Sequence, residues 1–178
     1  ICAPDCLFGS NTSSLSITEM ASGLQHEEQF LGIHFFNPAP VMKLVEIIRG
    51  DATSEETLEV ALDLVRSIGK EPVICRESPG FIVNRILIPM INEAVELLDC
   101  GVASREDIDQ AMKLGANHPM GPLELADFVG VDIVLAIMEV LYSETGDPKY
   151  RPSLMLRRLV RAGKLGRKSG EGFYQYKK

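Results

Sequence analysis

Apolar residues in the first 77 positions form short runs separated by turns, with one segment of helical spacing among them. Strands are expected at residues 7–9, 31–36, 44–48 and 71–75, and a short helix at 16–21. Short apolar runs that end at Gly, Pro or Asn favour strands. From Ser54, a typical N-cap residue, two glutamates and then apolar positions at helical spacing continue as far as Gly69. This order predicts part of an α/β sheet.

Beyond Ser78-Pro79-Gly80 the pattern predicts helices. They are expected at residues 81–99, 104–114, 122–128, 131–142 and 153–163, followed by a short extended end at 173–176. Capping supports these limits, because Ser104 and Ser153 suit the N-cap and Pro122 suits the first position of a helix. We therefore expect two domains, with residues 1–77 forming an α/β domain and residues 78–178 forming an all-α domain.

The run from Gly32 to Glu46 holds the most informative residues of the chain. Two expected strands flank a turn centred near Pro40, and His34 and Glu46 each lie six residues from that centre. In an antiparallel hairpin the two side chains therefore face each other within contact range. A carboxylate that holds one imidazole nitrogen leaves the other free to exchange a proton with a substrate. A plain structural histidine is the alternative interpretation.

Four further runs accompany this one in order along the chain. They are SNTSSLSIT at 10–18, SPGFIVNR at 78–85, AMKLGANHPMGP at 111–122 and GRKSGEGFY at 166–174. Together the five runs resemble the 3-hydroxyacyl-CoA dehydrogenase family, most closely its bacterial members that act on 3-hydroxybutyryl-CoA. The resemblance implies an oxidoreductase that interconverts 3-hydroxyacyl-CoA and 3-ketoacyl-CoA with NAD or NADP in fatty-acid or butanoate metabolism. It also implies a Rossmann-type domain followed by an all-α C-terminal domain.

The resemblance implies roles for four residues at the reacting group. His34 would act as the general base, and Glu46 would orient it. Ser13, in the turn after the first strand, would hydrogen-bond the reacting oxygen. Asn84 would donate to the same oxygen, so that both residues would also bind the substrate. The alternatives are structural, since Ser13 can cap a helix and Asn84 can bridge backbone groups at the domain junction.

The resemblance also implies three contacts to the cofactor. Ser13 would lie near the nicotinamide, Asn37 would touch the cofactor, and Lys168 would reach the nucleotide. Asn37 could equally stabilise its Asn-Pro turn, and Lys168 could be a solvated lysine. The chain has no G-x-G-x-x-G run, the fingerprint that cradles a dinucleotide pyrophosphate. We therefore expect residues 1–77 to be a C-terminal remnant of the NAD(P)-binding domain and the chain to be a fragment that is inactive alone.

Composition adds expectations about compartment and partners. The four cysteines lack the spacing of a metal site, so we expect no metal and a reducing, cytoplasmic compartment. Ten of the 18 Lys and Arg residues, but only one of the 25 acids, lie in residues 149–178. These basic residues spread round a helix without interleaved aromatic residues. We expect a solvated face, or an edge that reaches an anionic cofactor, and no nucleic-acid partner.

The apolar stretches 81–98 and 131–141 favour a homodimer interface in the helical domain. Polar residues within the first stretch argue against a membrane span. Two other interpretations stay open. The chain could be a non-catalytic helical dimerisation module with idle active-site residues. It could also come from a dehydrogenase of the same design that acts on a hydroxy acid without CoA, although the His-Phe-Phe-Asn-Pro run speaks against this.

Overall fold

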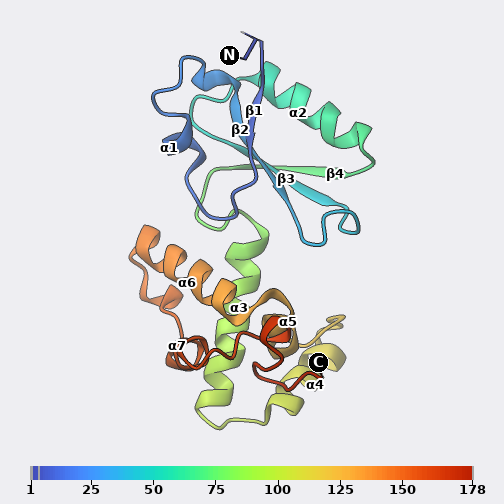
Figure 1. Ribbon diagram of the computed structural model, residues 1–178, viewed down its shortest axis with the longest axis vertical. Coiled ribbons are helices and arrows are strands. Elements are labelled where there is room, and N and C mark those ends of the chain that lie inside the picture. Colours follow the sequence, from blue (N-terminus) through green and yellow to red (C-terminus); the bar gives the residue numbers. More distant parts are fainter. Residues whose placement is uncertain (1, 4, 178) are drawn as a thin grey trace. The chain divides into compact units, whose positions relative to one another are not determined.

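The computed structural model describes residues 2, 3 and 5–177 and divides the chain into two compact units, one ending at Ile82 and the other beginning at Val83 (Figure 1). The first unit is an α/β structure with a four-stranded sheet. The second unit consists of helices and their connections. This confirms the predicted order of an α/β part followed by an all-α part.

The sheet of the first unit is mixed. Its strands, in their order across the sheet, are β1 (Phe8–Ser10), β2 (Phe30–Phe35), β3 (Leu44–Arg49) and β4 (Glu71–Arg76). The helical elements of this unit are α1 (Ile17–Ala21), α2 (Glu55–Ser67) and the 3-10 turn η1 (Glu27–Gln29). β1 runs parallel to β2, β3 antiparallel to β2, and β4 parallel to β3. The carboxyl ends of β1 and β2 therefore lie at the same edge of the sheet.

The two faces of the sheet carry different layers. Side chains alternate between the faces of a strand, and Val45 and Ile47 pack against α2. The opposite face carries Ile48, which packs against α1. Glu46 lies two residues before Ile48 on β3, so its side chain points to the same face of the sheet. His34 pairs with Glu46 in the antiparallel register, so its side chain points to that face as well. The candidate pair therefore lies on the face that α1 covers.

Gly32 allows α1 to approach this face closely. A β-carbon at Gly32 would lie 2.9 Å from Cβ of Ile48 and 3.0 Å from Cδ1 of Ile17. A larger residue would push α1 away from the strand that carries His34. The glycine therefore sets the spacing of the layer in which the candidate site is built.

The second unit packs its helices round one apolar core. Its helices are α3 (Val83–Asp99), α4 (Arg105–Gly115), α5 (Pro122–Val129), α6 (Val131–Thr145) and α7 (Leu154–Arg161), with the 3-10 turns η2 (Pro148–Tyr150) and η3 (Arg167–Ser169). The most deeply buried large side chains of this core include Ile88, Ile91, Leu123, Met138, Leu141 and Leu156. No helix formed by the described residues has the length and apolar character that a membrane crossing needs.

The start of α3 differs from the prediction. The helix begins at Val83 and not at residue 81. Phe81 instead has a left-handed backbone, with φ of 50°, and its N–H closes a turn on the carbonyl of Ser78 at 2.9 Å. The reason is tertiary, because the buried Phe81 ring packs in the first unit with Ile17 and Ile48.

The C-terminal tail also differs from the extended segment predicted at 173–176. This region contains isolated β-bridges and not a strand, with Glu171 bridged to Gly166 and to Gln175. A buried side chain holds the tail instead, since Asp127 accepts the N–H groups of Phe173 at 2.9 Å and Tyr174 at 2.8 Å. Such side-chain bonds have no periodicity, and the hydrophobic pattern of the tail therefore does not reveal them.

Candidate active site

The hairpin of β2 and β3 brings His34 and Glu46 together, which confirms the geometry predicted from the sequence. The two residues are paired in the register, and Nδ1 of His34 lies 2.8 Å from Oε2 of Glu46. Both are buried, with 4% and 0% of their surface exposed. A buried carboxylate requires hydrogen-bond donors. The geometry therefore favours the tautomer in which Nδ1–H donates to Glu46, which leaves Nε2 as an acceptor.

The loop after β1 supplies a third group. Oγ of Ser13 lies 3.1 Å from Nε2 of His34. Within the loop, Oγ1 of Thr12 accepts the N–H of Leu15 at 3.0 Å. Oδ1 of Asn11 accepts the N–H of Phe35 at 2.9 Å. Asn11 thus ties the loop that carries Ser13 to the end of the strand that carries His34.

Ser13, His34 and Glu46 form a series of hydrogen bonds suited to proton transfer. The carboxylate fixes the imidazole and stabilises its charged form, while Nε2 can exchange a proton with a group placed beside Ser13. Serine hydrolases use the same order of groups. The geometry is therefore compatible with acid–base chemistry, and the kind of reaction has to follow from other observations.

Aromatic rings and a thiol lie near this series. The ring centroid of His34 is 4.6 Å from that of Phe36 and 5.5 Å from that of Phe81. Burial, together with the negative charge of Glu46, raises the pKa of Cys75 to about 11. This thiol is protonated at neutral pH, so Cys75 does not act as a nucleophile beside the pair.

Sequence reasoning missed three contributors to the site: Asn11, the Phe81 ring and the backbone of Ile82. Oε1 of Glu46 accepts the N–H of Ile82 at 3.1 Å. A backbone donor leaves no trace in the identity of its side chain. Asn11 did carry a signal, since asparagine in a turn often bonds nearby backbone. Its actual partner, however, lies 24 residues further along the chain.

Two of the predicted site residues, Asn37 and Asn84, lie outside this hydrogen-bonded series. Asn37 is exposed in the turn between β2 and β3. Asn84 is half-buried in the first turn of α3 and belongs to the second unit. Their roles at the reacting oxygen and the cofactor stay predictions.

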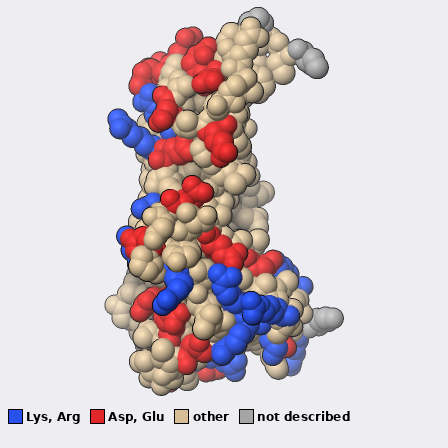
Figure 2. Space-filling view, turned by 90° about the vertical axis from the view of Figure 1, so that its left-hand side faces the viewer, with Lys and Arg blue, Asp and Glu red and all other residues tan. Residues whose placement is uncertain are grey.

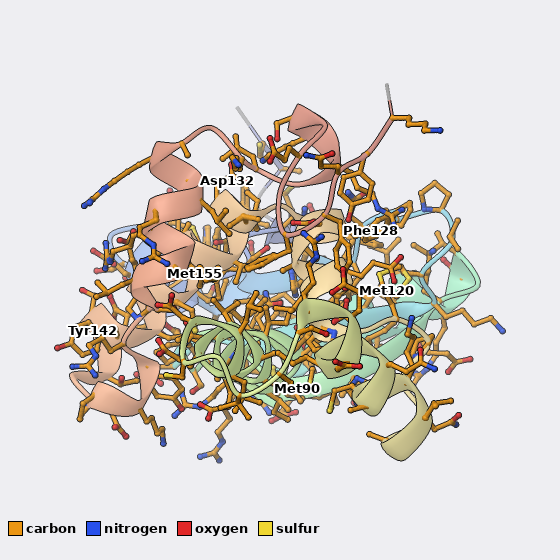
Figure 3. All side chains as sticks on the ribbon, turned by 90° about the horizontal axis from the view of Figure 1, so that it is seen from below. Met90, Met120, Phe128, Asp132, Tyr142 and Met155 are labelled. Carbon is orange, nitrogen blue, oxygen red and sulfur yellow. The ribbon has the colours of Figure 1, made fainter. Side chains whose placement is uncertain are left out.

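Lys168 is the remaining predicted residue outside the series. It lies in η3, and its Nζ is 2.5 Å and 2.7 Å from the two carboxylate oxygens of Asp132 in the first turn of α6. Its neighbour Arg167 lies over the ring of Phe128, 5.1 Å from the centroid. Figure 3 labels Asp132 and Phe128, which anchor these two basic side chains from α6 and α5. Lys168 is therefore held within its own unit.

The basic residues of the second unit form a face on which both charges are present. Figure 2 shows Lys and Arg side chains gathered over this unit, with Asp and Glu among them. Ion pairs connect Arg105 to Glu106, Arg157 to Glu139, Arg158 to Asp99, Lys164 to Glu171 and Arg167 to Glu124. This pairing fits the solvated face predicted from the sequence.

The residues present fit the reactive end of a dinucleotide. Ser13 and His34 lie at the carboxyl ends of the parallel strands β1 and β2, the edge at which nucleotides bind in α/β sheets. The chain has no G-x-G-x-x-G run, which is the sequence that cradles the pyrophosphate in many dinucleotide-binding domains. Among the described residues, no group of three or more His, Cys, Asp and Glu side chains could hold a metal ion.

Comparison with protein families identifies both units. Residues 1–78 match the family described as 3-hydroxyacyl-CoA dehydrogenase, NAD binding domain. Residues 80–176 match the family described as 3-hydroxyacyl-CoA dehydrogenase, C-terminal domain. The first match identifies residues 1–78 as NAD binding domain, and it corrects the expectation that they are only a remnant of one.

Individual relatives agree with these matches. The chain is 58% identical to a 3-hydroxybutyryl-CoA dehydrogenase of Clostridioides difficile, over 100% of this chain and 63% of that protein. It is 50% identical to human mitochondrial hydroxyacyl-coenzyme A dehydrogenase, over 98% of this chain and 56% of that protein. The crystal structure of (S)-3-hydroxybutyryl-CoA dehydrogenase PaaH1 from Ralstonia eutropha matches with a TM-score of 0.96 and 55% identity, covering 99% of this chain and 62% of that one. The chain thus spans less than two thirds of these relatives, and it belongs to the 3-hydroxyacyl-CoA dehydrogenase family.

Proposed function

We propose that the protein to which this chain belongs interconverts 3-hydroxyacyl-CoA, in particular 3-hydroxybutyryl-CoA, and 3-ketoacyl-CoA with NAD or NADP. The observation that carries the proposal is the series Ser13–His34–Glu46 at the carboxyl ends of β1 and β2. Family membership supports the reaction class. The names of the Clostridioides difficile and Ralstonia eutropha relatives support the substrate.

Oxidation of a secondary alcohol requires a base for the hydroxyl proton and an acceptor for the hydride. Nε2 of His34 takes the proton, and Glu46 stabilises the resulting imidazolium through Nδ1. The hydroxyl of Ser13 hydrogen-bonds the reacting oxygen. A bound nicotinamide ring supplies the hydride acceptor. In the reverse direction His34 returns its proton to the 3-oxygen of the ketoacyl group.

Other residues complete the proposal. Asn84 acts as a second donor to the reacting oxygen, and Asn37 and Lys168 join Ser13 as cofactor contacts. Both NAD and NADP remain candidates, because the acidic residue that reads the ribose follows the G-x-G-x-x-G run in dinucleotide-binding domains. That run is absent from these 178 residues.

The test is the reduction of acetoacetyl-CoA, followed as consumption of NADH and, separately, of NADPH. Two purified proteins are compared. One is this chain, and the other, called the completed protein below, joins it to the part of the Clostridioides difficile relative that it does not span. We expect turnover by the completed protein and none by the chain alone, since the pyrophosphate fingerprint is missing from the chain.

One control substrate and two further outcomes define the limits of the proposal. Acetoacetate without CoA is the matched substrate, and equal turnover of both substrates would contradict recognition of an acyl-CoA. Absence of turnover in both proteins would contradict the dehydrogenase and favour a non-catalytic helical dimerisation module. Turnover by the chain alone would contradict the proposed need for the part supplied by the relative.

A further inference from the structure

Phe81 has a backbone conformation that residues with large side chains rarely adopt. Its φ is 50°, and it follows Gly80, whose φ is 73°. A left-handed backbone at a residue other than glycine is unfavourable and persists where its surroundings hold it. Here the surroundings are apolar, since the ring is 4% exposed and packs with Ile17 and Ile48.

This conformation brings neighbouring groups onto both members of the buried pair. The ring of Phe81 meets the ring of His34 edge-on, with planes at 63° and centroids 5.5 Å apart. The next residue, Ile82, directs its N–H to Oε1 of Glu46 at 3.1 Å. Oε2 of the same carboxylate lies 2.8 Å from Nδ1 of His34. A single turn of backbone thus restrains the imidazole and its carboxylate together.

We propose that Phe81 is a positioning residue of this acid–base pair. It keeps the N–H of Ile82 on Glu46, and its ring confines the His34 ring through the edge-on contact. Without the anchored ring the backbone relaxes out of the left-handed region, Oε1 loses this donor, and the carboxylate can turn away from Nδ1. The catalytic role of the pair rests on the proposed function, whereas its positioning by Phe81 can be tested in the chain itself.

The experiment is nuclear magnetic resonance on the chain, with Phe81→Leu as the test variant. Phe30→Leu is the matched control, because Phe30 packs against the same small apolar cluster but lies at the opposite end of β2 from His34. The first signal followed is hydrogen exchange of the Ile82 amide. The second is the low-field Nδ1–H resonance of His34, which is assigned by its loss in His34→Gln.

We expect Phe81→Leu to accelerate exchange of the Ile82 amide at least about tenfold more than Phe30→Leu does. We also expect it to broaden the His34 resonance, while Phe30→Leu leaves that resonance sharp. Equal effects of the two variants, or no effect of Phe81→Leu, would overturn the proposal. Fast exchange of the Ile82 amide in the unsubstituted chain would overturn it as well, and this measurement depends on no variant.

Activity of the completed protein separates this proposal from the proposed function. If the completed protein does not reduce acetoacetyl-CoA while both signals respond as expected, the proposed function fails and the positioning by Phe81 holds. If the completed protein is active while the signals do not respond, the positioning fails alone.

Discussion

Lys168 has two competing roles at the scale of single residues, one in an ion pair and one at the cofactor. The side chains of Lys168 and Asp132 are 46% and 33% exposed. An exposed pair of this kind adds about 0–1 kcal/mol to stability. Removal of Lys168 should therefore cost the fold little, so a variant can test its proposed role at the nucleotide.

We expect Lys168→Ala to raise the KM of the completed protein for NADH about tenfold, with a smaller change in kcat. A charge-assisted hydrogen bond to a bound group contributes about 1.5–3 kcal/mol, and a contact away from the reacting atoms acts on ground and transition states alike. Initial-rate kinetics at varied NADH measure both constants. Asp132→Asn is the control, since it breaks the ion pair but keeps the lysine. An unchanged KM in Lys168→Ala would leave Lys168 as a solvated lysine paired with Asp132.

The pair of His34 and Glu46 could be predicted because its geometry follows from counting along a hairpin. Strand alternation and equal distance from the turn are enough to place the two side chains opposite each other. Asn11 and Phe81 could not be placed in this way. Their partners are fixed by tertiary packing, and neither has a periodic pattern that connects it to His34.

At the scale of elements, the helix starts that depend on local hydrogen bonds could be predicted. Ser54, Ser104 and Ser153 accept N–H groups of their own first turns, at 3.1 Å, 3.1 Å and 3.2 Å. These bonds join residues two or three positions apart, so the sequence contains both partners. The start of α3 and the tail at 173–176 depend on distant partners, and both were predicted wrongly.

Asp127 gives the tail a pH-dependent anchor. It accepts the hydroxyl of Tyr176 at 3.0 Å in addition to the N–H groups of Phe173 and Tyr174. Burial raises the pKa of Asp127 above its ordinary 3.8, despite these hydrogen bonds. The folded chain therefore holds the proton more tightly than the unfolded chain. The stabilisation that this tighter proton binding gives the folded chain is complete below pH 3.8 and is lost as pH rises through the raised pKa of Asp127.

We expect Asp127→Asn to lower the free energy of unfolding by about 1–3 kcal/mol, because an amide nitrogen replaces one acceptor of a buried N–H. The stabilising effect of protonated Asp127 is lost as pH rises. The difference in free energy of unfolding between the unsubstituted chain and Asp127→Asn should therefore shrink as pH rises from below 3.8 towards neutrality. Urea unfolding across this range measures the difference. Asp63→Asn, at an exposed carboxylate of α2, is the control and should show little effect. An advantage that grows with pH would contradict the account.

At the scale of the whole molecule, residues 1–77 are proposed to serve nucleotide binding and residues 78–178 substrate binding and dimerisation. The second unit offers apolar surface for such an interface, since Ile86 on α3 is 69% exposed and Ile133 on α6 is 44% exposed. Single exposed apolar side chains are common on protein surfaces, so these two residues are candidates for the proposed interface and need a direct test.

We expect Ile86→Asp to weaken self-association of the completed protein at least about a hundredfold, because burying an unpaired carboxylate at an interface costs several kcal/mol. Sedimentation equilibrium measures the dissociation constant. Val60→Asp is the matched control, since Val60 is 54% exposed on α2 of the first unit. A monomeric unsubstituted protein, or equal weakening by both variants, would contradict a dimer through α3.

The most direct test of the central claim is the turnover of His34→Gln in the completed protein. The claim is that His34 exchanges the proton of a 3-hydroxyacyl substrate, with Ser13 at 3.1 Å and Glu46 at 2.8 Å from its two ring nitrogens. We predict that kcat for acetoacetyl-CoA reduction falls about 10²–10⁴-fold. The control His26→Gln, at a partly exposed histidine paired with Glu28, should keep normal turnover. Near-normal kcat in His34→Gln would contradict the account.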